Sequence, residues 1–154
     1  MAKQHYIADY KKDGFTISTD NARLDLQTIY NFLNSVYWAK NISLAIVKKS
    51  IENSLCFGVY NHENELVGFA RVVSDYATFA WLADVFILEK YRARGLAKWL
   101  IECIINHPEL QGLRRWMLAT RNAHGLYAKY EFKPLLKVET FMEIYRPNIY
   151  EIEK

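Results

Sequence analysis

The spacing of hydrophobic residues in the first third of the chain predicts a strand followed by two helices. Polar and apolar residues alternate over residues 14–19, as in a strand with one buried face. Over residues 25–38, apolar residues recur three and four positions apart, which predicts a helix. Ser43 is a suitable N-cap for a second helix that continues to about Ile51.

The middle of the chain changes to short apolar runs typical of strands. Residues 55–60 and 65–73 flank the turn-rich residues 61–64 and therefore predict a β-hairpin. Residues 81–88 form another apolar run that is interrupted only by Asp84. A strand of this kind is expected in the interior of a sheet, covered on both faces.

The last third predicts two more helices and two more strands. A helical stripe covers residues 95–105, and a short helix is expected at 123–130. Residues 114–119 and 140–145 are predicted as strands, the second closed by Pro147. The order β-α-α-β-β-β-α-β-α-β predicts an α/β fold with a central mixed sheet flanked by helices.

The composition agrees with a folded, single-domain protein covering residues 1–154. With 51% hydrophobic and 24% charged residues, the chain resembles ordinary globular proteins rather than disordered ones. The net charge of +3 comes from scattered basic residues, which argues against nucleic-acid or membrane-surface binding. No apolar run approaches the roughly 18 residues of a membrane span.

The first ten residues and the two cysteines predict a cytoplasmic location. Residues 1–10 lack the apolar core of a signal peptide. Cys56 and Cys103 are far apart in sequence and lack CxxC spacing, so we expect reduced thiols rather than a disulfide. No Cys/His cluster or HxxxH pattern points to a metal site.

The segment that follows residues 81–88 carries the clearest chemical signal. Gly95 and Ala97 are small enough for close approach of a ligand to the backbone, at the expected start of a helix with unpaired N–H groups. Arg92, Arg94 and Lys98 add positive charge there. This combination favours a phosphate-bearing ligand, and a solvated helix start with surface arginines is the alternative. The chain has neither GxxxxGK[ST] nor GxGxxG, so P-loop and Rossmann nucleotide sites lack their motifs.

Two motifs resemble those of the GNAT superfamily of N-acetyltransferases. Arg92-x-x-Gly95-x-Ala97, after a strand and opening a helix, resembles that family's acyl-CoA pyrophosphate loop. Residues 126–132 read Leu-Tyr-Ala-Lys-Tyr-Glu-Phe and resemble its Leu-Tyr-x-x-x-Gly-Phe segment. Glu131 stands where the family usually has glycine, and Thr120 where it often has asparagine.

The resemblance implies an acetyl-CoA-dependent acyltransferase that needs no metal. Acetyl-CoA, the co-substrate, would enter an opening between the strands predicted at 81–88 and 114–119. The backbone of Val85, Phe86 and Ile87 would pair with its pantetheine arm. The pyrophosphate would be held by the loop formed by Arg92, Ala93, Arg94, Gly95, Leu96, Ala97 and Lys98.

Two residues are candidates for the proton transfers of such a reaction. Asp84, the one charge in its strand, could take a proton from the amine, or it could be a structural carboxylate held by an arginine or by backbone groups. Tyr127 matches the family's frequent general acid, whose role would be to protonate the leaving thiolate, and core packing is the alternative. Asp75 and Glu143 are weaker candidates for the base.

The acceptor is predicted to be a small-molecule amine. Tyr30, Trp38 and Tyr76, together with Tyr37, could form an aromatic wall for an apolar or cationic amine. The sequence shows no acidic cluster for a basic peptide. The alternatives are a protein or peptide N-acetyltransferase and a catalytically silent acyl-CoA-binding or sensor domain. The oligomeric state is open, a homodimer included.

Overall fold

The computed structural model describes residues 6–151 and contains one six-stranded sheet with the strand order β1-β2-β3-β4-β5-β6. Neighbouring strands are antiparallel except for the last pair, β5 and β6, which is parallel. The strands are β1 (Asp9–Lys12), β2 (Phe15–Ser18), β3 (Leu55–Tyr60), β4 (Leu66–Ser74), β5 (Phe79–Ile87) and β6 (Arg115–Leu118).

Within residues 6–151, four α-helices flank the sheet, and polar side chains define where the first two begin. The Asp25 carboxylate accepts a hydrogen bond from the Thr28 backbone N–H, and the Ser43 hydroxyl accepts one from the Ile46 N–H. Each bond satisfies a helix-start N–H group that has no partner within the helix. The helices are α1 (Leu26–Ser35), α2 (Leu44–Glu52), α3 (Leu96–Ile105) and α4 (His124–Ala128).

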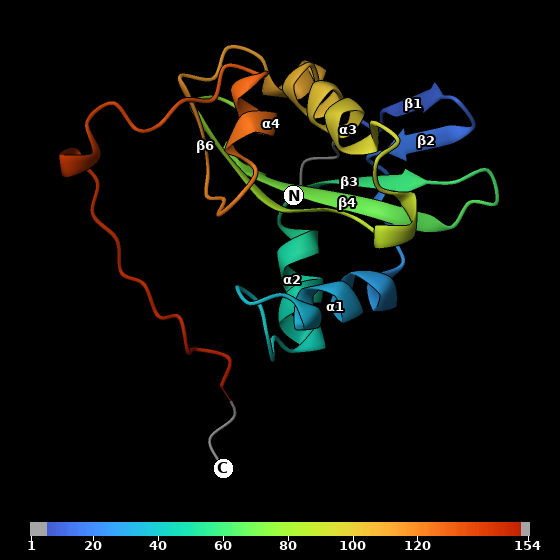
Figure 1. Cartoon of the computed structure of the whole chain (residues 1–154), viewed down its shortest axis with the longest axis horizontal. Helices are drawn as coiled ribbons and strands as arrows, with labels where there is room; N and C mark the ends of the chain where they lie inside the picture. The colour runs from blue at the N-terminus through green and yellow to red at the C-terminus, as the bar shows by residue number, and fades with distance from the viewer. Residues whose placement is uncertain (1–5, 152–154) are drawn as a thin grey trace.

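The helices cover both faces of the sheet, which therefore has two hydrophobic cores. Figure 1 shows α1 and α2 on one side of the sheet and α3 and α4 on the other. On the α1/α2 side, Ile29, Val47 and Phe69 are fully buried. On the α3 side, Phe57 and Leu100 are fully buried. Burial on both faces explains why the inner strands read as continuous apolar runs in the sequence.

The fold confirms the predicted mixed sheet and its flanking helices, with two differences at its ends. The strand β1 was not predicted, and it forms a hairpin with β2 at one edge of the sheet. The strand predicted at 140–145 is wrong, because residues 141–146 pair with no strand in the described part of the chain. A short 3-10 turn, Val138–Thr140, precedes this extended segment.

No helix within residues 6–151 is long and apolar enough to cross a membrane.

Candidate active site

The pairing of the parallel strands β5 and β6 ends partway along β5. Their register ends at Leu82 and Leu118, where β6 stops. β5 continues to Ile87 and stays paired with β4 on its other side. The edge of β5 beyond Leu82 therefore has no strand partner on the β6 side within residues 6–151, and this unpaired stretch is here called the opening between β5 and β6.

A β-bulge places Asp84 at this opening. The register between β4 and β5 shifts between Phe69 and Arg71, so that β5 carries one extra residue. Asp84 has a φ of 54°, in the left-handed region that aspartate and asparagine tolerate better than most residues. Bulges commonly redirect a side chain next to a functional site. Here the redirected group is the charged residue that interrupts the strand.

The Asp84 carboxylate links β5 to β4 and to the α1–α2 loop. Its Oδ2 accepts a hydrogen bond from Arg71 Nε at 2.9 Å, and its Oδ1 accepts one from Trp38 Nε1 at 3.2 Å. Arg71 Nη1 donates in turn to the Ser54 hydroxyl. The Asp84 side chain is 12% exposed. A carboxylate offers about four lone-pair positions, so this one anchors two side chains and still has acceptor capacity.

Two loops meet beside this carboxylate. Tyr37 and Trp38 of the α1–α2 loop lie edge to face, with ring centroids 5.3 Å apart. The Arg121 guanidinium, from the loop between β6 and α4, lies 3.4 Å from the centre of the Tyr37 ring. Trp38 is 44% exposed and Tyr37 is 55% exposed. The arrangement presents aromatic surface and a fixed carboxylate to a ligand on the α1/α2 side of the opening.

The structure does not bring all of the predicted acceptor residues into one wall. Tyr30 packs against the core on the α1/α2 side of the sheet. Tyr76 follows the end of β4 and packs against the core on the α3 side. The two tyrosines therefore face opposite sides of the sheet, which sequence spacing alone cannot show. Of the predicted set, Trp38 and its neighbour Tyr37 lie beside Asp84.

The loop after β5 combines left-handed backbone conformations with open space at the start of α3. Ala93 and Gly95 both have left-handed φ values, 63° and 78°. A Cβ added at Gly95 would meet no atom within 4 Å, so the space beside its backbone is open. No side chain caps the start of α3. Successive N–H groups at such an end form a concave site for anions.

The charged residues of this loop differ in their contacts. Arg92 Nε donates to the Ile87 carbonyl at 2.9 Å and so fixes the loop to the end of β5. Arg94 and Lys98 are exposed and present their charge to solvent. Leu96, Phe86 and Ile87 are buried, while Val85 and Ala97 are half-buried.

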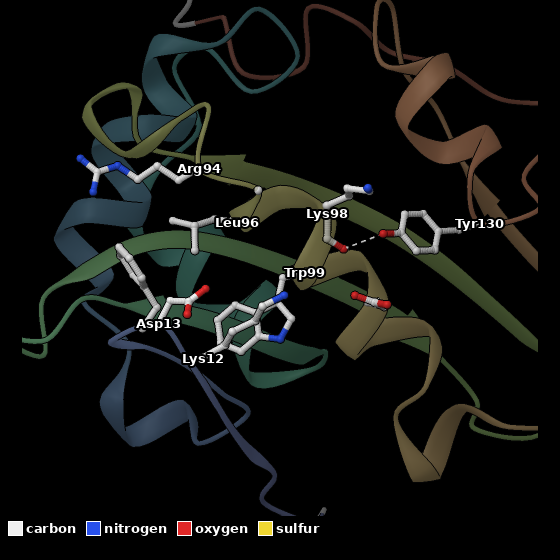
Figure 2. A pocket seen from close by; sticks show the side chains of 10 residues that line it. Lys12, Asp13, Arg94, Leu96, Lys98, Trp99 and Tyr130 are labelled. Atoms are coloured by element: carbon white, nitrogen blue, oxygen red, sulfur yellow. Dashed lines mark hydrogen bonds between the residues drawn. The ribbon is translucent and has the colours of Figure 1, made fainter.

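A surface pocket of about 410 Å³ adjoins the start of α3. Figure 2 shows Arg94 and Tyr130 at opposite ends of this pocket, with Lys12, Asp13 and Trp99 beside them. Lys12 and Asp13 come from the β1–β2 hairpin. Because the sequence did not predict β1, it provided no basis for placing this hairpin against α3. The full lining consists of Lys12, Asp13, Phe15, Arg94, Gly95, Leu96, Lys98, Trp99, Glu102 and Tyr130.

Tyr127 lies in α4 and is buried, with 8% of its surface exposed. Its ring packs edge-on against Phe132, with centroids 5.8 Å apart. Burial raises the pKa of its phenol, so the hydroxyl keeps its proton at neutral pH. No residue between 6 and 151 forms a hydrogen bond with this hydroxyl. The side chain thus contributes to packing and also retains a proton that is available for donation.

The two departures from the family motifs have local explanations. Glu131 has a φ of 71°, a conformation in which glycine is free of strain, so the backbone keeps the shape that the family's glycine would favour. Its neighbour Phe132 closes the end of α4 through an N–H bond to the Tyr127 carbonyl. The Thr120 hydroxyl accepts a hydrogen bond from the Ala123 N–H and so stabilises the turn that leads into α4.

The weaker candidates for the base are placed less favourably. Asp75 lies in the turn between β4 and β5, where hydrogen bonds from the Thr78 hydroxyl, the Thr78 N–H and the Ala77 N–H hold the pKa of its carboxyl well below its usual range. Such a carboxylate is a poor proton acceptor. Glu143 is exposed on the segment that follows α4. Within residues 6–151, no group of three or more His, Cys, Asp or Glu side chains could hold a metal ion.

Comparison with known proteins identifies the family. The model of the Acetyltransferase (GNAT) family matches residues 24–132, which include the loop after β5 and Tyr127. The chain belongs to this family. GNAT proteins use acetyl-CoA as the acetyl donor, and the chain is a GNAT-family N-acetyltransferase.

Individual relatives agree with this assignment. A candidate acetyltransferase of Gibberella zeae is 31% identical over 143 residues, covering 79% of this chain and 80% of that protein. A crystal structure of a candidate GNAT acetyltransferase from Xanthomonas campestris pv. campestris is 50% identical, with a TM-score of 0.87 over 90% of this chain and 97% of that one. A GNAT acetyltransferase of Elizabethkingia anophelis with acetyl-CoA bound shares the fold, at 17% identity and a TM-score of 0.61 over 88% of this chain and 90% of that one.

Proposed function

We propose that this GNAT protein transfers an acetyl group from acetyl-CoA to a primary amine of a small molecule, by direct attack of the amine on the thioester. The observation that carries the proposal is the opening between β5 and β6. The loop after β5, with its uncapped helix start, borders the opening, and the pair Asp84 and Trp38 lies on its α1/α2 side. A donor and an acceptor can therefore meet at one point of the sheet.

The loop after β5 fits the anionic part of acetyl-CoA, which supplies the acetyl group as a thioester. Gly95 leaves open space at the start of α3, and the uncapped N–H groups there suit a pyrophosphate. Arg94 and Lys98 add positive charge, and Arg92 holds the loop to β5. From Val85 to Ile87 the edge of β5 pairs with no strand on the β6 side, and apart from the Ile87 carbonyl, which Arg92 occupies, its backbone groups can pair with an amide-bearing chain in the manner of an added strand.

The α1/α2 side fits a small amine better than a basic peptide. Tyr37 and Trp38 offer aromatic surface that an ammonium group or an apolar body can contact. The Asp84 carboxylate compensates the charge of Arg71, so the Arg121 guanidinium beside Tyr37 is the positive charge that an approaching amine meets. This charge disfavours a lysine-rich tail more than a small molecule with one amine.

Two proton transfers are assigned to Asp84 and Tyr127. An alkyl ammonium with a pKa near 10 is about 99.9% protonated at pH 7, so the amine must lose a proton before it attacks. Asp84 accepts this proton, directly or through water, on a lone pair that Arg71 and Trp38 do not use. Tyr127, whose burial keeps its phenol protonated, gives a proton to the departing sulfur.

A catalytically silent acyl-CoA sensor is the second candidate, because the Asp84 carboxylate already has the two partners expected of a structural group.

We further propose that the protein works in the cytoplasm, since Cys56 and Cys103 are both free thiols buried in the fold.

The test is release of free thiol from acetyl-CoA across a panel of primary amines and peptides. We expect turnover with at least one small amine. Tyr127→Phe keeps the ring and its packing, so acetyl-CoA affinity should be unchanged while turnover falls by about 10²-fold. Tyr76→Phe, a tyrosine packed on the core away from Asp84, is the matched control and should keep its turnover. Tight acetyl-CoA binding without turnover on any amine would favour the sensor, and a basic peptide as the best acceptor would overturn the small-molecule assignment.

A further inference from the structure

Arg121 lies beside the aromatic residues of the proposed acceptor site and has no counter-charge. Its guanidinium is 3.4 Å from the centre of the Tyr37 ring, the shortest contact of this kind within residues 6–151. Arg121 is exposed, and no carboxylate in the described part of the chain lies within ion-pair distance of it. Arg71, by contrast, is paired with Asp84 at 2.9 Å. The positive charge of Arg121 is therefore not compensated by residues 6–151.

The contact with Tyr37 holds the Arg121 side chain and leaves its N–H groups unused. A guanidinium that lies over an aromatic face still offers N–H donors along its planar edge. No residue between 6 and 151 accepts a hydrogen bond from Arg121. Such an edge matches two oxygens of a carboxylate or a phosphate, which a guanidinium can bind through two parallel hydrogen bonds. Because the ring already restrains the side chain, an anion that binds here immobilises little that is free to move.

Contacts link this guanidinium to the Asp84 carboxylate through the two aromatic rings. Trp38 Nε1 donates to Asp84 Oδ1, the Trp38 ring lies edge to face with Tyr37, and Tyr37 carries Arg121. The site thus offers a negative group, apolar surface and a positive group. A complementary ligand has an ammonium group, an apolar section and an anion. An acceptor with an amine alone would suit Asp84 and be repelled by Arg121.

On the basis of the acetyl transfer proposed above, we propose that the acceptor amine carries a carboxylate or a phosphate on a short apolar chain, and that Arg121 binds this anion. The amine lies at Asp84 and the apolar chain lies against Trp38 and Tyr37. Arg121 is then a specificity-determining residue that acts on the acceptor. The anionic part of acetyl-CoA is assigned to a different segment, the loop after β5.

Acceptors of matched size isolate the contribution of the anion. The panel contains ε-aminocaproate, aminopentylphosphonate, the uncharged ε-aminocaproamide, and glycine, which lacks the apolar chain. We expect the better of the two anionic acceptors to exceed ε-aminocaproamide by about tenfold or more in kcat/KM, because hydrogen bonds between charged groups are the strong ones. The comparison of the two anions identifies whether the site prefers a carboxylate or a phosphate. Glycine should be a poorer acceptor than ε-aminocaproate.

Substitution of Arg121 should remove the preference for an anion selectively. Arg121→Gln should lower kcat/KM for the anionic acceptors by about tenfold, mainly through KM, and change that for ε-aminocaproamide by less than about twofold. Arg121→Lys keeps the charge and should retain part of the preference. Arg114→Gln is the matched control, because Arg114 is exposed at the opposite end of β6, and it should behave as wild type. Acetyl-CoA affinity should be the same in all three variants.

Calorimetric binding of the same acceptors in the presence of coenzyme A, which carries no acetyl group, distinguishes a failure of the anion site from a failure of acetyl transfer. Tighter binding of an anionic acceptor than of ε-aminocaproamide, lost in Arg121→Gln, supports the anion site even where no acceptor is turned over, a result that would overturn the transfer instead. Equal binding and equal turnover of anionic and uncharged acceptors would overturn the anion site and leave the transfer standing.

Two results with Arg121→Gln would also overturn the proposal. An equal loss on every acceptor, together with a lower melting temperature, would show that Arg121 only holds its loop against Tyr37. A loss of acetyl-CoA affinity would place Arg121 in the coenzyme site.

Discussion

Gly95→Ala tests the coenzyme loop because a matched glycine exists elsewhere in the chain. Gly95 and Gly112 have nearly equal left-handed φ values, 78° and 76°. A Cβ added at either position would meet no atom within 4 Å. The conformational penalty of alanine should therefore be the same at both sites, about 1 kcal/mol. For a chain of this size, that penalty lowers the melting temperature by about 2–4 °C.

The two variants should differ in coenzyme binding. The methyl group that Gly95→Ala introduces would stand beside the uncapped N–H groups at the start of α3, where the pyrophosphate is proposed to lie. We expect acetyl-CoA to bind Gly95→Ala at least tenfold more weakly, a loss of about 1.4 kcal/mol. Gly112 lies in the loop before β6, and Gly112→Ala should keep the wild-type affinity.

Calorimetric titration with acetyl-CoA and thermal melts of the same preparations measure both effects. Equal affinities for Gly95→Ala and Gly112→Ala would refute the placement of the coenzyme at this loop. A much larger loss of stability at Gly95 than at Gly112 would refute the reasoning that backbone strain alone accounts for the stability change.

Three further predictions follow from strained or buried groups. Asp84→Asn should lower turnover at pH 7 more than it lowers acetyl-CoA affinity, and the loss of turnover should shrink toward pH 10, where more of the amine is already unprotonated. A loss of turnover that is independent of pH, together with a lower melting temperature, would show that Asp84 only anchors Arg71 and Trp38. Glu131 has a φ of 71°, which glycine adopts without strain, so Glu131→Gly should raise the free energy of unfolding by about 1 kcal/mol. Glu131→Ala should not raise it. Equal increases in the free energy of unfolding for both variants, measured in urea melts, would exclude strain as the cause. Burial raises the pKa of Tyr60 to about 12, whereas a tyrosine in the unfolded chain has a pKa of about 10. The unfolded chain therefore loses this proton first, and the free energy of unfolding should fall as the pH rises from about 10 to about 12. A fall of the same size in Tyr60→Phe would exclude this cause.

Sequence patterns predicted the helices well where local chemistry determines them. Asp25 and Ser43 precede apolar stripes, and both act as N-caps in the structure. The strand containing Asp84 was recognised because both of its faces are covered, which produces a continuous apolar run.

The ends of the sheet could not be predicted in this way. β1 has the sequence Asp-Tyr-Lys-Lys, which carries no alternating pattern, and it becomes a strand because β2 provides a partner. The segment 140–145 has the composition of a strand but finds no partner in its own chain. Strand formation depends on pairing between distant segments, which local periodicity does not contain.

The candidate site was predictable in part. Asp84 and Gly95 were identified because each is unusual for its predicted element. The hydrogen-bond partners of Asp84 were not predicted, because Arg71 and Trp38 come from two other segments of the chain and contact Asp84 at the bulge in β5. The left-handed backbone of Ala93 was also missed, since alanine carries no signal for that conformation.

The hydrogen bond from the Tyr130 hydroxyl to the Lys98 carbonyl ties the residues just after α4 to the first turn of α3. Because α4 spans only five residues, it has little stability of its own and depends on such attachments for its order. Coenzyme that immobilises the start of α3 would also hold α4 in place, including the phenol of Tyr127 three residues away from the attachment. Amide hydrogen exchange in α4 should therefore slow when acetyl-CoA binds, although the coenzyme itself is proposed to contact the preceding helix. The same attachment would let the enzyme align Tyr127, its proposed proton donor, only after acetyl-CoA has arrived.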